Sequence, residues 1–296
     1  MTVPLLFELK ATPGLAERLC QDYPLEQGQL SRRRFPDGES YVRLLTPVAG
    51  REVIALCTLD RPDEVTLPLL FFAAAARDQG AQRIGLVAPY LGYMRQDRAF
   101  QPGEAVTSAA YAALLSNAFD WLVTVDPHLH RYPDLAAIYT IPAVAATAAK
   151  PIADWIRSEV QNPVLIGPDV ESTQWIERVA RLAGAPYLIF EKARRGDRDV
   201  VVTPREQEIF PGGTPVIIDD IVSSARTMIE AARLVRAAGL GAPVCIGVHA
   251  IFAEDAYAAL AAAGPARIAT VNTVAHSSNE IEIAGELRAA IAGMLK

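Results

Sequence analysis

Short apolar runs alternate with longer amphipathic stretches along most of the chain. Several runs are apolar throughout, as strands buried on both faces require, and the stretches between them repeat at helical spacing. The predicted strands are residues 5–9, 53–57, 84–87, 121–125, 164–166, 187–190, 216–218, 244–248 and 268–271. The predicted helices are residues 63–79, 108–117, 145–159, 173–182, 227–238 and 254–263. This alternation predicts an α/β fold in which βαβ units build mostly parallel sheets.

The length of the chain favours two domains. It has 296 residues, and single domains usually have roughly 100–200. The two halves show a similar succession of strands and helices, although no repeat is visible residue by residue. No Gly/Ser-rich linker separates them, and the best boundary lies close to Lys150 and Pro151. We therefore expect one domain at residues 1–147 and a second at residues 148–296.

Composition narrows the classes of function. The net charge of -6 argues against a general nucleic-acid binder, because binding to a phosphate backbone needs a basic surface. Cys20, Cys57 and Cys245 are far apart, which suggests neither a disulfide framework nor a zinc site and fits a reducing cytoplasm. The longest apolar run, residues 67–76, is too short to span a bilayer, and no signal peptide is expected at the N-terminus.

An acidic pair precedes a predicted helix near residue 220. The apolar run 216–218 ends at Asp219 and Asp220, and a small polar loop then leads into the helix. A helix N-terminus offers free N–H groups and a partial positive charge, which suit a phosphate. Carboxylates of this kind can accept hydrogen bonds from sugar hydroxyls. The alternative is that Ser223, Ser224 or Thr227 is only a helix N-cap.

Two other predicted strands in the first half are also followed by chemically useful side chains. Arg95 and Gln96 lie in an aromatic loop after residues 84–87, and arginine suits bidentate contacts with phosphate. His128 follows residues 121–125 and can bind phosphate or a Mg²⁺-nucleotide. The alternative in both places is a solvated turn, since a pair of histidines two residues apart is a weak metal signal.

A highly charged segment follows the predicted strand at residues 187–190. It contains Lys192 and Arg194, in a chain with four lysines and 24 arginines, so Lys192 does not belong to a generic lysine-rich surface. The segment is either a mobile lid that brings cations to a polyphosphate or a solvated hairpin. Neither a Walker A loop nor a dinucleotide-binding glycine motif follows any predicted strand.

The order and spacing of these motifs resemble the ribose-phosphate diphosphokinase (phosphoribosyl diphosphate synthetase) family over nearly the whole chain. The stretch 95–100, followed by Gly103 and Glu104, looks closer to the archaeal-type members. The motifs that carry the resemblance are Phe35-Pro36-Asp37-Gly38-Glu39, Pro89-Tyr90-Leu91-Gly92-Tyr93-Met94-Arg95-Gln96-Asp97, Thr124-Val125-Asp126-Pro127-His128, Gly167-Pro168-Asp169, Lys192-Ala193-Arg194 and Asp219-Asp220 with its loop.

The resemblance implies a fold and a reaction. The fold would be two phosphoribosyltransferase-like domains, each with a central mostly parallel sheet flanked by helices. The C1 hydroxyl of ribose 5-phosphate would attack the β-phosphorus of ATP and give phosphoribosyl diphosphate and AMP, a step of nucleotide biosynthesis. Positioning and charge neutralisation would be the protein's main tasks, and Mg²⁺ would be the cofactor. A homodimer or a larger homo-oligomer is expected.

The resemblance also implies roles for single residues. Lys192 and Arg194 would be catalytic and stabilise the transferring diphosphoryl group. His128 and Asp169 would lie at the metal. The expected ATP-binding residues are Phe35, Asp37 and Glu39 from a neighbouring subunit together with Arg95, Gln96 and His128. The expected ribose 5-phosphate residues are Asp219, Asp220, Ser223, Ser224, Ala225, Arg226 and Thr227.

The chain departs from the family pattern in two places. The family's sugar-phosphate loop reads Asp-Thr-Gly-Gly-Thr, whereas here it is Ser223-Ser224-Ala225-Arg226-Thr227; and Val170-Glu171-Ser172 replaces the usual Gly-Gly after Asp169. Glycine lets a backbone approach phosphate or take a positive φ, so Ala225 restricts the loop. Arg226 either adds a guanidinium to the phosphate or faces solvent. A non-catalytic regulatory homologue, a phosphoribosyltransferase and a nucleotide-binding sensor remain alternatives.

Overall fold

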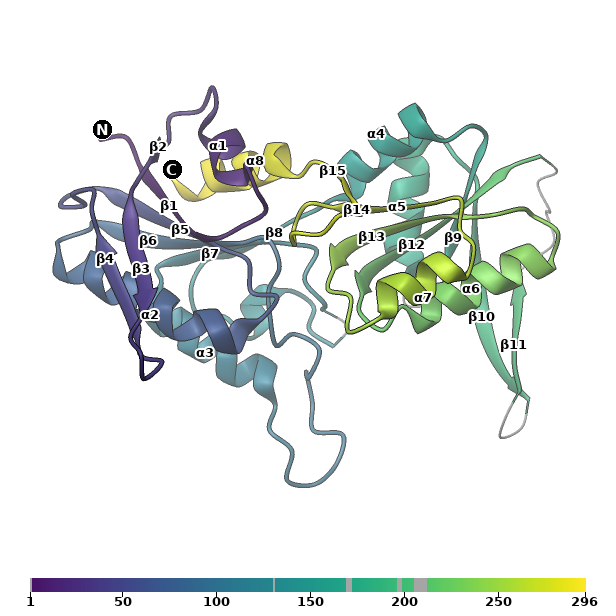
Figure 1. The fold of residues 1–296 in the computed structure, drawn as a ribbon, viewed down its shortest axis with the longest axis horizontal. Helices are drawn as coiled ribbons and strands as arrows, with labels where there is room; N and C mark the ends of the chain where they lie inside the picture. The colour runs from purple at the N-terminus through teal and green to yellow at the C-terminus, as the bar shows by residue number, and fades with distance from the viewer. Residues whose placement is uncertain (1, 130, 169–171, 196–198, 205–211) are drawn as a thin grey trace. The chain divides into compact units, whose positions relative to one another are not determined.

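The computed structural model describes residues 2–129, 131–168, 172–195, 199–204 and 212–296. In residues 190–195 and 199–204, and at Gln174, it describes the backbone only. The chain forms two compact units (Figure 1). Unit 1 consists of Met1–Thr147, Thr273–Ala275 and Ala284–Lys296, and unit 2 consists of Ala148–Asn272 and His276–Ile283.

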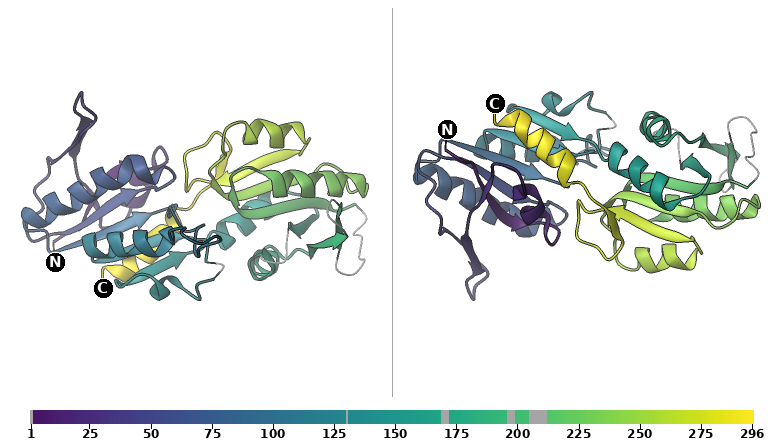
Figure 2. Two further views of the ribbon diagram at one scale, coloured as in Figure 1. Left: turned by 90° about the horizontal axis from the view of Figure 1, so that it is seen from below. Right: turned by 90° about the horizontal axis from the view of Figure 1, so that it is seen from above.

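Unit 1 is built on a six-stranded parallel sheet in the order β2-β1-β5-β6-β7-β8. Helices cover both faces, with α1 and α8 on one side and α2 and α3 on the other (Figure 1). A separate antiparallel hairpin, β3–β4, projects from this unit (Figure 2). The bounds are β1 Leu5–Lys10, α1 Leu15–Cys20, β2 Glu26–Gln27, β3 Leu30–Arg34, β4 Ser40–Leu44, β5 Glu52–Cys57, α2 Pro62–Asp78, β6 Arg83–Ala88, α3 Thr107–Ala118, β7 Trp121–Val125, the 3-10 helix η1 Leu135–Ala137, β8 Ala143–Ala146 and α8 Ala284–Met294.

Unit 2 repeats this plan with a seven-stranded sheet in the order β11-β10-β9-β12-β13-β14-β15. All neighbours are parallel except β10 and β11, which form an antiparallel hairpin. The bounds are α4 Ala149–Glu159, β9 Pro163–Gly167, α5 Thr173–Ala183, β10 Tyr187–Arg195, β11 Asp199–Pro204, β12 Thr214–Val222, α6 Arg226–Ala237, β13 Val244–Ala250, α7 Ala256–Ala262, β14 Arg267–Val271 and β15 Asn279–Ile281.

Each unit has its own apolar core. In unit 1, Phe7 of β1 packs edge-to-face on Phe72 of α2, with 5.3 Å between ring centroids. In unit 2, fully buried Ile217 and Cys245 pack with α6 and α7. Central strands such as β5 and β13 are buried along nearly their whole length. The continuous apolar runs of the sequence are therefore strands covered on both faces, as expected.

Two helices lie on the unit that their preceding strand does not belong to. Helix α4 follows β8 of unit 1 but packs on α5 and β15 in unit 2, whereas α8 follows β15 of unit 2 but packs on α1, β7 and β8 in unit 1. The expected division at residues 147 and 148 placed residues 284–296 in the second half. The structure instead places this helix on unit 1.

The α/β prediction is confirmed, and every predicted strand and helix is present. Three boundaries differ by four or more residues. The predicted strand at residues 187–190 continues to Arg195, because its second part pairs with β11. The predicted helix at residues 145–159 begins at Ala149, because Ala143–Ala146 pairs with β7 as a short strand. The predicted strand at residues 216–218 continues to Val222, because β13 runs beside it up to Ala250. No helix within the described ranges is long and apolar enough to cross a membrane.

Candidate functional site

In each unit the chain adds strands first on one side of the first strand and then on its other side, which creates a topological switch point at the carboxyl ends of the strands. In unit 1 the chain runs from β1 outward to β2 and later returns on the other side of β1 as β5. In unit 2 it runs from β9 to β10 and returns as β12. The carboxyl ends of strands at such a reversal form the usual ligand crevice of open α/β sheets. Among the described residues, Arg95, Gln96 and His128 lie near the edge of unit 1, and Asp219, Asp220 and the loop 223–227 lie near that of unit 2.

Asp219 and Asp220 lie inside β12, close to the reversal in unit 2. Both are half-buried. The Asp219 Oδ1 accepts the N–H of Asp220 at 3.0 Å, and the Asp220 Oδ1 accepts the N–H of Ile221 at 2.8 Å. These bonds fix the two side chains against their own strand while leaving further acceptor capacity on each carboxylate. The pair therefore suits hydrogen-bond donors such as sugar hydroxyls.

The loop after β12 turns into α6 through Ala225. This residue has φ 55° and ψ 7°, the left-handed conformation, and it is the N-cap of α6 with no side-chain capping bond. The alternative in which Ser223, Ser224 or Thr227 caps the helix is therefore not what the structure shows. Because no side chain caps the first turn, its N–H groups can serve an anion. The side chain of Arg226 is exposed.

Ala225 takes a conformation that the glycine of the family pattern would adopt more readily. A left-handed conformation costs an L-residue with a Cβ roughly 1–2 kcal/mol, and glycine avoids this cost. The loop keeps the conformation with alanine nonetheless, supported by the Ser223 carbonyl, which accepts the N–H of Ala253 at 3.1 Å. The substituted loop has thus retained a turn into a helix N-terminus.

In unit 1 the loop after β6 is held rigidly. A Cβ on Gly92 would lie 2.7 Å from the carbonyl oxygen of Leu59, so only glycine fits there. Further along, Asp97 has a buried carboxylate, 2% exposed, whose two oxygens each lie 3.1 Å from the same Arg131 nitrogen. The Tyr132 hydroxyl donates to the Asp97 carbonyl at 3.2 Å. This framework presents Arg95 at the surface and Gln96 half-buried.

His128 follows β7 and also lies at this edge. It is half-buried, and the turn before it is shaped by Asp126, which has a φ of 32°. The N–H of Asp126 donates to the Ala146 carbonyl at 3.0 Å, which ties the end of β7 to the end of β8. His128 and the loop of Arg95 thus leave from neighbouring strands at the same edge.

Phe35, Asp37 and Glu39 form the tip of the β3–β4 hairpin. The Phe35 ring is 38% exposed and stands edge-on to Tyr41 at 6.1 Å. Asp37 and Glu39 are exposed, and the N–H of Glu39 donates to the Asp37 Oδ1 at 3.2 Å. The tip presents an aromatic ring and two acids away from its own unit, which is suitable for contact with another molecule.

Lys192 and Arg194 lie in β10, in its hairpin with β11. Their backbones pair with Val202 and Val200, respectively. The backbone register supports a hairpin at this point, and the positions of the two side chains lie outside the described part. Asp169, the other expected metal residue, also lies outside the described residues.

Mg²⁺ is the cofactor that the family resemblance implies. Within the described ranges, no group of three or more His, Cys, Asp or Glu is arranged to hold a metal ion. Mg²⁺ usually keeps several waters and is bound through one or two carboxylates plus substrate phosphates. The oxygen donors of Asp219 and Asp220 fit that chemistry, and the nitrogen of His128 fits it less well.

The structure also shows contacts that sequence reasoning missed. The ion pair of Lys10 with Asp60, at 2.7 Å, lies at the strand reversal of unit 1, and the pair of Asp97 with Arg131 lies at the same edge. Asp97 stands within a quoted motif, but nothing in the sequence pointed to Arg131. The only available signal was that each of these residues follows a predicted strand.

Comparisons with known proteins cover nearly the whole chain. The N-terminal domain of ribose phosphate pyrophosphokinase matches residues 4–118, and the phosphoribosyl transferase domain matches residues 134–284. The ribose-phosphate pyrophosphokinase of Methanopyrus kandleri is 32% identical over 279 residues, which cover 94% of each chain. That of Sulfolobus acidocaldarius is 30% identical over 276 residues, 92% of this chain and 94% of its own. Both organisms are archaea, as the motif at residues 95–104 predicted.

A solved structure agrees on the fold. Phosphoribosylpyrophosphate synthetase from Mycobacterium smegmatis matches with a TM-score of 0.85, covers 99% of both chains and has 24% sequence identity. At this identity the match supports the fold alone. Together with the domain matches, it confirms the expectation of two phosphoribosyltransferase-like domains.

Proposed function

The chain belongs to the ribose-phosphate pyrophosphokinase family, and on this premise we propose that it transfers the diphosphoryl group of ATP to the C1 hydroxyl of ribose 5-phosphate. The products are phosphoribosyl diphosphate and AMP. The observation that carries the proposal is that the family resemblance spans both units and includes the site motifs at both carboxyl edges. The enzyme is a diphosphotransferase of nucleotide biosynthesis, and a cytoplasmic location fits its free, widely separated cysteines.

Ribose 5-phosphate is proposed to bind at the reversal point of unit 2. The Asp219 and Asp220 carboxylates accept the sugar hydroxyls, and the uncapped first turn of α6 receives the 5-phosphate. Ser223, Ser224 and Thr227 line this loop, and the backbone at Ala225 turns it toward the helix. Arg226 is exposed, and we propose that its guanidinium adds to the contacts of the 5-phosphate; the alternative is that it faces solvent.

ATP is proposed to bind at the edge of unit 1. Arg95, Gln96 and His128 leave adjacent strands there, held by the buried pair of Asp97 and Arg131. Lys192 and Arg194 are proposed to neutralise the charge that develops during in-line attack on the β-phosphorus. When bound, Mg²⁺ supplies further neutralisation of the phosphates, with His128 and Asp169 as the proposed nearby residues.

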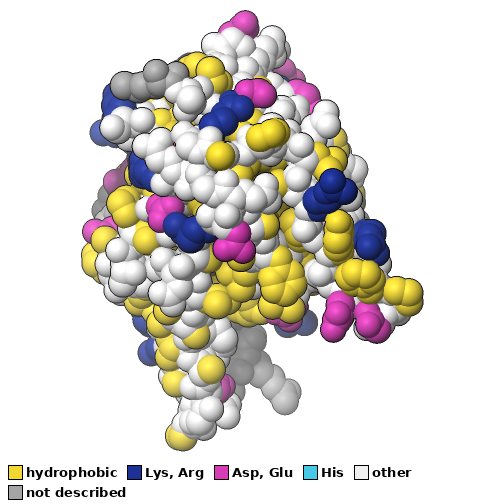
Figure 3. All heavy atoms as spheres, turned by 90° about the vertical axis from the view of Figure 1, so that its left-hand side faces the viewer, with side chains coloured by type: hydrophobic (Ala, Val, Ile, Leu, Met, Phe, Trp, Pro, Cys, Tyr) yellow, Lys and Arg dark blue, Asp and Glu magenta, His cyan; other side chains and the backbone are white. Residues whose placement is uncertain are grey.

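The adenine is proposed to contact the hairpin tip of a second copy of the chain, so that the active form is a homodimer or a larger homo-oligomer. The exposed ring of Phe35 and the acids Asp37 and Glu39 support this proposal. Large apolar side chains are also exposed on α2, with Leu67 56% and Phe71 45% exposed. Hydrophobic side chains gather on the face shown in Figure 3, which is suitable for burial against a copy.

The decisive experiment identifies the nucleotide product. Purified protein is incubated with Mg-ATP and ribose 5-phosphate, and AMP and ADP are separated by chromatography. Attack at the β-phosphorus gives AMP and phosphoribosyl diphosphate in equal amounts. Stoichiometric ADP without AMP would show an ordinary kinase instead, and a reaction without ribose 5-phosphate is the control for background hydrolysis.

One observation favours a second candidate, a non-catalytic homologue that regulates an active partner. Residues 223–227 lack the acid and both glycines of the family pattern. The same incubation separates the candidates, because a regulator alone gives no AMP. The substituted position is then tested with Arg226→Ala, for which we expect a few-fold rise in KM for ribose 5-phosphate and none for ATP. A rise for ATP alone would mean that the two substrates are assigned to the wrong edges.

Assembly is tested separately by sedimentation and activity on the same samples. If Phe35 completes a neighbour's ATP site, dilution to monomer abolishes activity. A fully active monomer contradicts the proposed role of the tip.

A further inference from the structure

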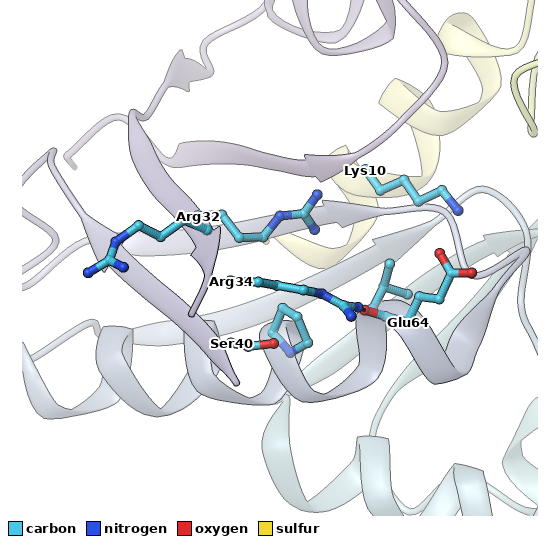
Figure 4. A pocket seen from close by; sticks show the side chains of 8 residues that line it. Lys10, Arg32, Arg34, Ser40 and Glu64 are labelled. Atoms are coloured by element: carbon cyan, nitrogen blue, oxygen red, sulfur yellow. Dashed lines mark hydrogen bonds between the residues drawn. The ribbon is translucent and has the colours of Figure 1, made fainter. Parts of the chain in front are cut away.

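Unit 1 has a pocket of about 340 Å³ between the β3–β4 hairpin, close to its tip, and the start of α2 (Figure 4). This volume is typical of sites for small molecules. Four of its lining residues are cationic and one is acidic. The pocket is lined by Lys10, Arg32, Arg33, Arg34, Ser40, Glu64, Val65 and Pro68. None of these residues has a place in the proposed reaction.

The pocket lies where the strand order of unit 1 reverses. Lys10 is the last residue of β1, and its ammonium pairs with Asp60, which follows β5, at 2.7 Å. The N–H of Thr58 donates to the Lys10 carbonyl at 2.7 Å, so the ends of the two strands are held together. This edge is the equivalent of the one that carries Asp219 in unit 2. A ligand crevice is therefore expected here on topology alone.

The arginines of β3 divide between two tasks. Arg33 stacks on the rings of Phe35 and Tyr41, with 4.4 Å to each centroid. Because side chains alternate along a strand, Arg32 and Arg34 extend from the opposite face of the hairpin. Arg34 donates to the Glu64 carbonyl at 3.4 Å, which places its guanidinium at the first turn of α2.

Arg32 supplies a cation without a protein partner. Among the described residues it has no hydrogen bond or ion pair. Its charge nevertheless acts on the thiol of Cys57, at the end of β5: burial raises the pKa of Cys57 to about 12, while Arg32 and Lys10 act to lower it. Arg32 and Lys10 line the same pocket, and Asp60 forms an ion pair with Lys10.

We propose that this pocket is an anion site for a small phosphate monoester. The phosphate binds between Lys10, Arg32 and Arg34, because guanidinium groups match phosphate oxygens in geometry and charge. The organic part lies against Val65 and Pro68 of α2. The site is independent of the proposed reaction, and it would bind its ligand in a protein with no diphosphokinase activity.

Isothermal titration tests the proposal with glycerol 3-phosphate as the probe, in the wild-type chain and in Arg32→Gln. A phosphate site in unit 2 can also take the probe, so the measured quantity is the number of equivalents bound per chain. We expect Arg32→Gln to bind about one equivalent fewer than wild type, or to bind that equivalent at least tenfold more weakly. Equal binding by the two proteins overturns the proposal.

The matched control is Arg43→Gln. Arg43 lies in β4 of the same hairpin and is exposed, but it does not line the pocket. We therefore expect the Arg43→Gln variant to bind glycerol 3-phosphate as the wild type does. Equal losses in both variants would show a general charge effect and refute the site. Arg34→Gln is a second test of the pocket and should show the same loss as Arg32→Gln, with folding checked from the urea midpoint.

Two further probes define the ligand. Inorganic phosphate is expected to bind the site several-fold more weakly than glycerol 3-phosphate, and glycerol is not expected to bind. If inorganic phosphate binds as tightly as the monoester, Val65 and Pro68 contribute nothing and the assignment to a monoester is wrong.

Discussion

The carboxyl edges of the two units have the same topology and opposite charge. In unit 1 the first and returning strands, β1 and β5, are bordered by Lys10 and by the arginines of a hairpin. In unit 2 the returning strand, β12, carries Asp219 and Asp220. Topology therefore determines where a ligand can bind, and the side chains at the strand ends decide which ligand fits: cationic groups in unit 1 favour an anion, and the carboxylates in unit 2 favour a donor of hydrogen bonds.

The two hairpins differ in a related way. Each precedes the returning strand of its unit in the chain, but β3–β4 follows the edge strand β2, whereas β10 and β11 are themselves the outermost strands of their sheet. The β3–β4 hairpin is a separate sheet that packs on α2, whereas β10 pairs with β9 through residues 187–189 and with β11 through residues 190–195. A hairpin continuous with the main sheet is fixed to the edge of its own unit. A separate one is suited to reach another molecule.

The largest expected effect tests whether the β10–β11 hairpin is the catalytic one. We expect Lys192→Ala to lower kcat by about 10²–10³, with KM for ATP changed little, because charge stabilisation made only in the transition state appears in kcat. Steady-state kinetics measures both constants. Lys150→Ala is the control, since Lys150 is an exposed lysine paired with Asp154 on α4. A Lys192 variant within a few-fold of wild type would make this segment an ordinary hairpin.

The second prediction separates structural charges from ligand-binding charges. In unit 1, Arg131→Met leaves the buried carboxylate of Asp97 without its cation, and we expect the free energy of unfolding to fall by about 2–3 kcal/mol. We expect a smaller loss of unfolding free energy than for a fully buried ion pair, because the Arg131 side chain is partly exposed. Urea unfolding provides the measurement. Arg98→Met, which removes an exposed arginine from the same loop, should change stability by less than about 0.5 kcal/mol.

The third prediction concerns the rigidity of the loop that carries Arg95. Gly92→Ala places a Cβ 2.7 Å from the Leu59 carbonyl, which is backbone and cannot move aside easily, so we expect a loss of about 1–3 kcal/mol. A Cβ on Gly285, in α8, meets nothing within 4 Å, and Gly285→Ala should gain about 0.5–1 kcal/mol. Urea midpoints that move in the same direction for both variants would contradict this reading.

The smallest effect is a pH dependence in unit 2. Burial lowers the pKa of His276 from its ordinary 6.5, and its Nδ1 accepts the N–H of Ser278 at 3.2 Å. The unfolded chain therefore binds the proton more readily than the folded one. The contribution of His276 to stability is fully present above pH 6.5 and is lost as the pH falls through the lowered pKa, and it is small because the ring is only partly buried. Urea midpoints between pH 7.5 and 5 should show this loss in wild type, and a smaller one in His276→Gln.

The sequence by itself determined the order of most strands and helices. Continuous apolar runs can be stable only when both faces are covered, so residues such as 53–57 and 244–248 marked central strands without any knowledge of their partners. Local chemistry was readable in the same way: the acids of β12 precede a helix start in the sequence itself. The elements that it missed lack this signal. The β3 strand contains three successive arginines, and β8 is largely alanine.

Only the tertiary structure decided which distant residues meet. Asp97 and Arg131 are 34 positions apart, and they meet because parallel strands β6 and β7 place the loops that follow them at one edge. Helix α8 packs on unit 1 and not on unit 2, to which its preceding strand belongs, because α1, β7 and β8 cover its apolar face. Local patterns report what each segment must bury, whereas the choice of what covers it depends on the strand order, which no local pattern contains.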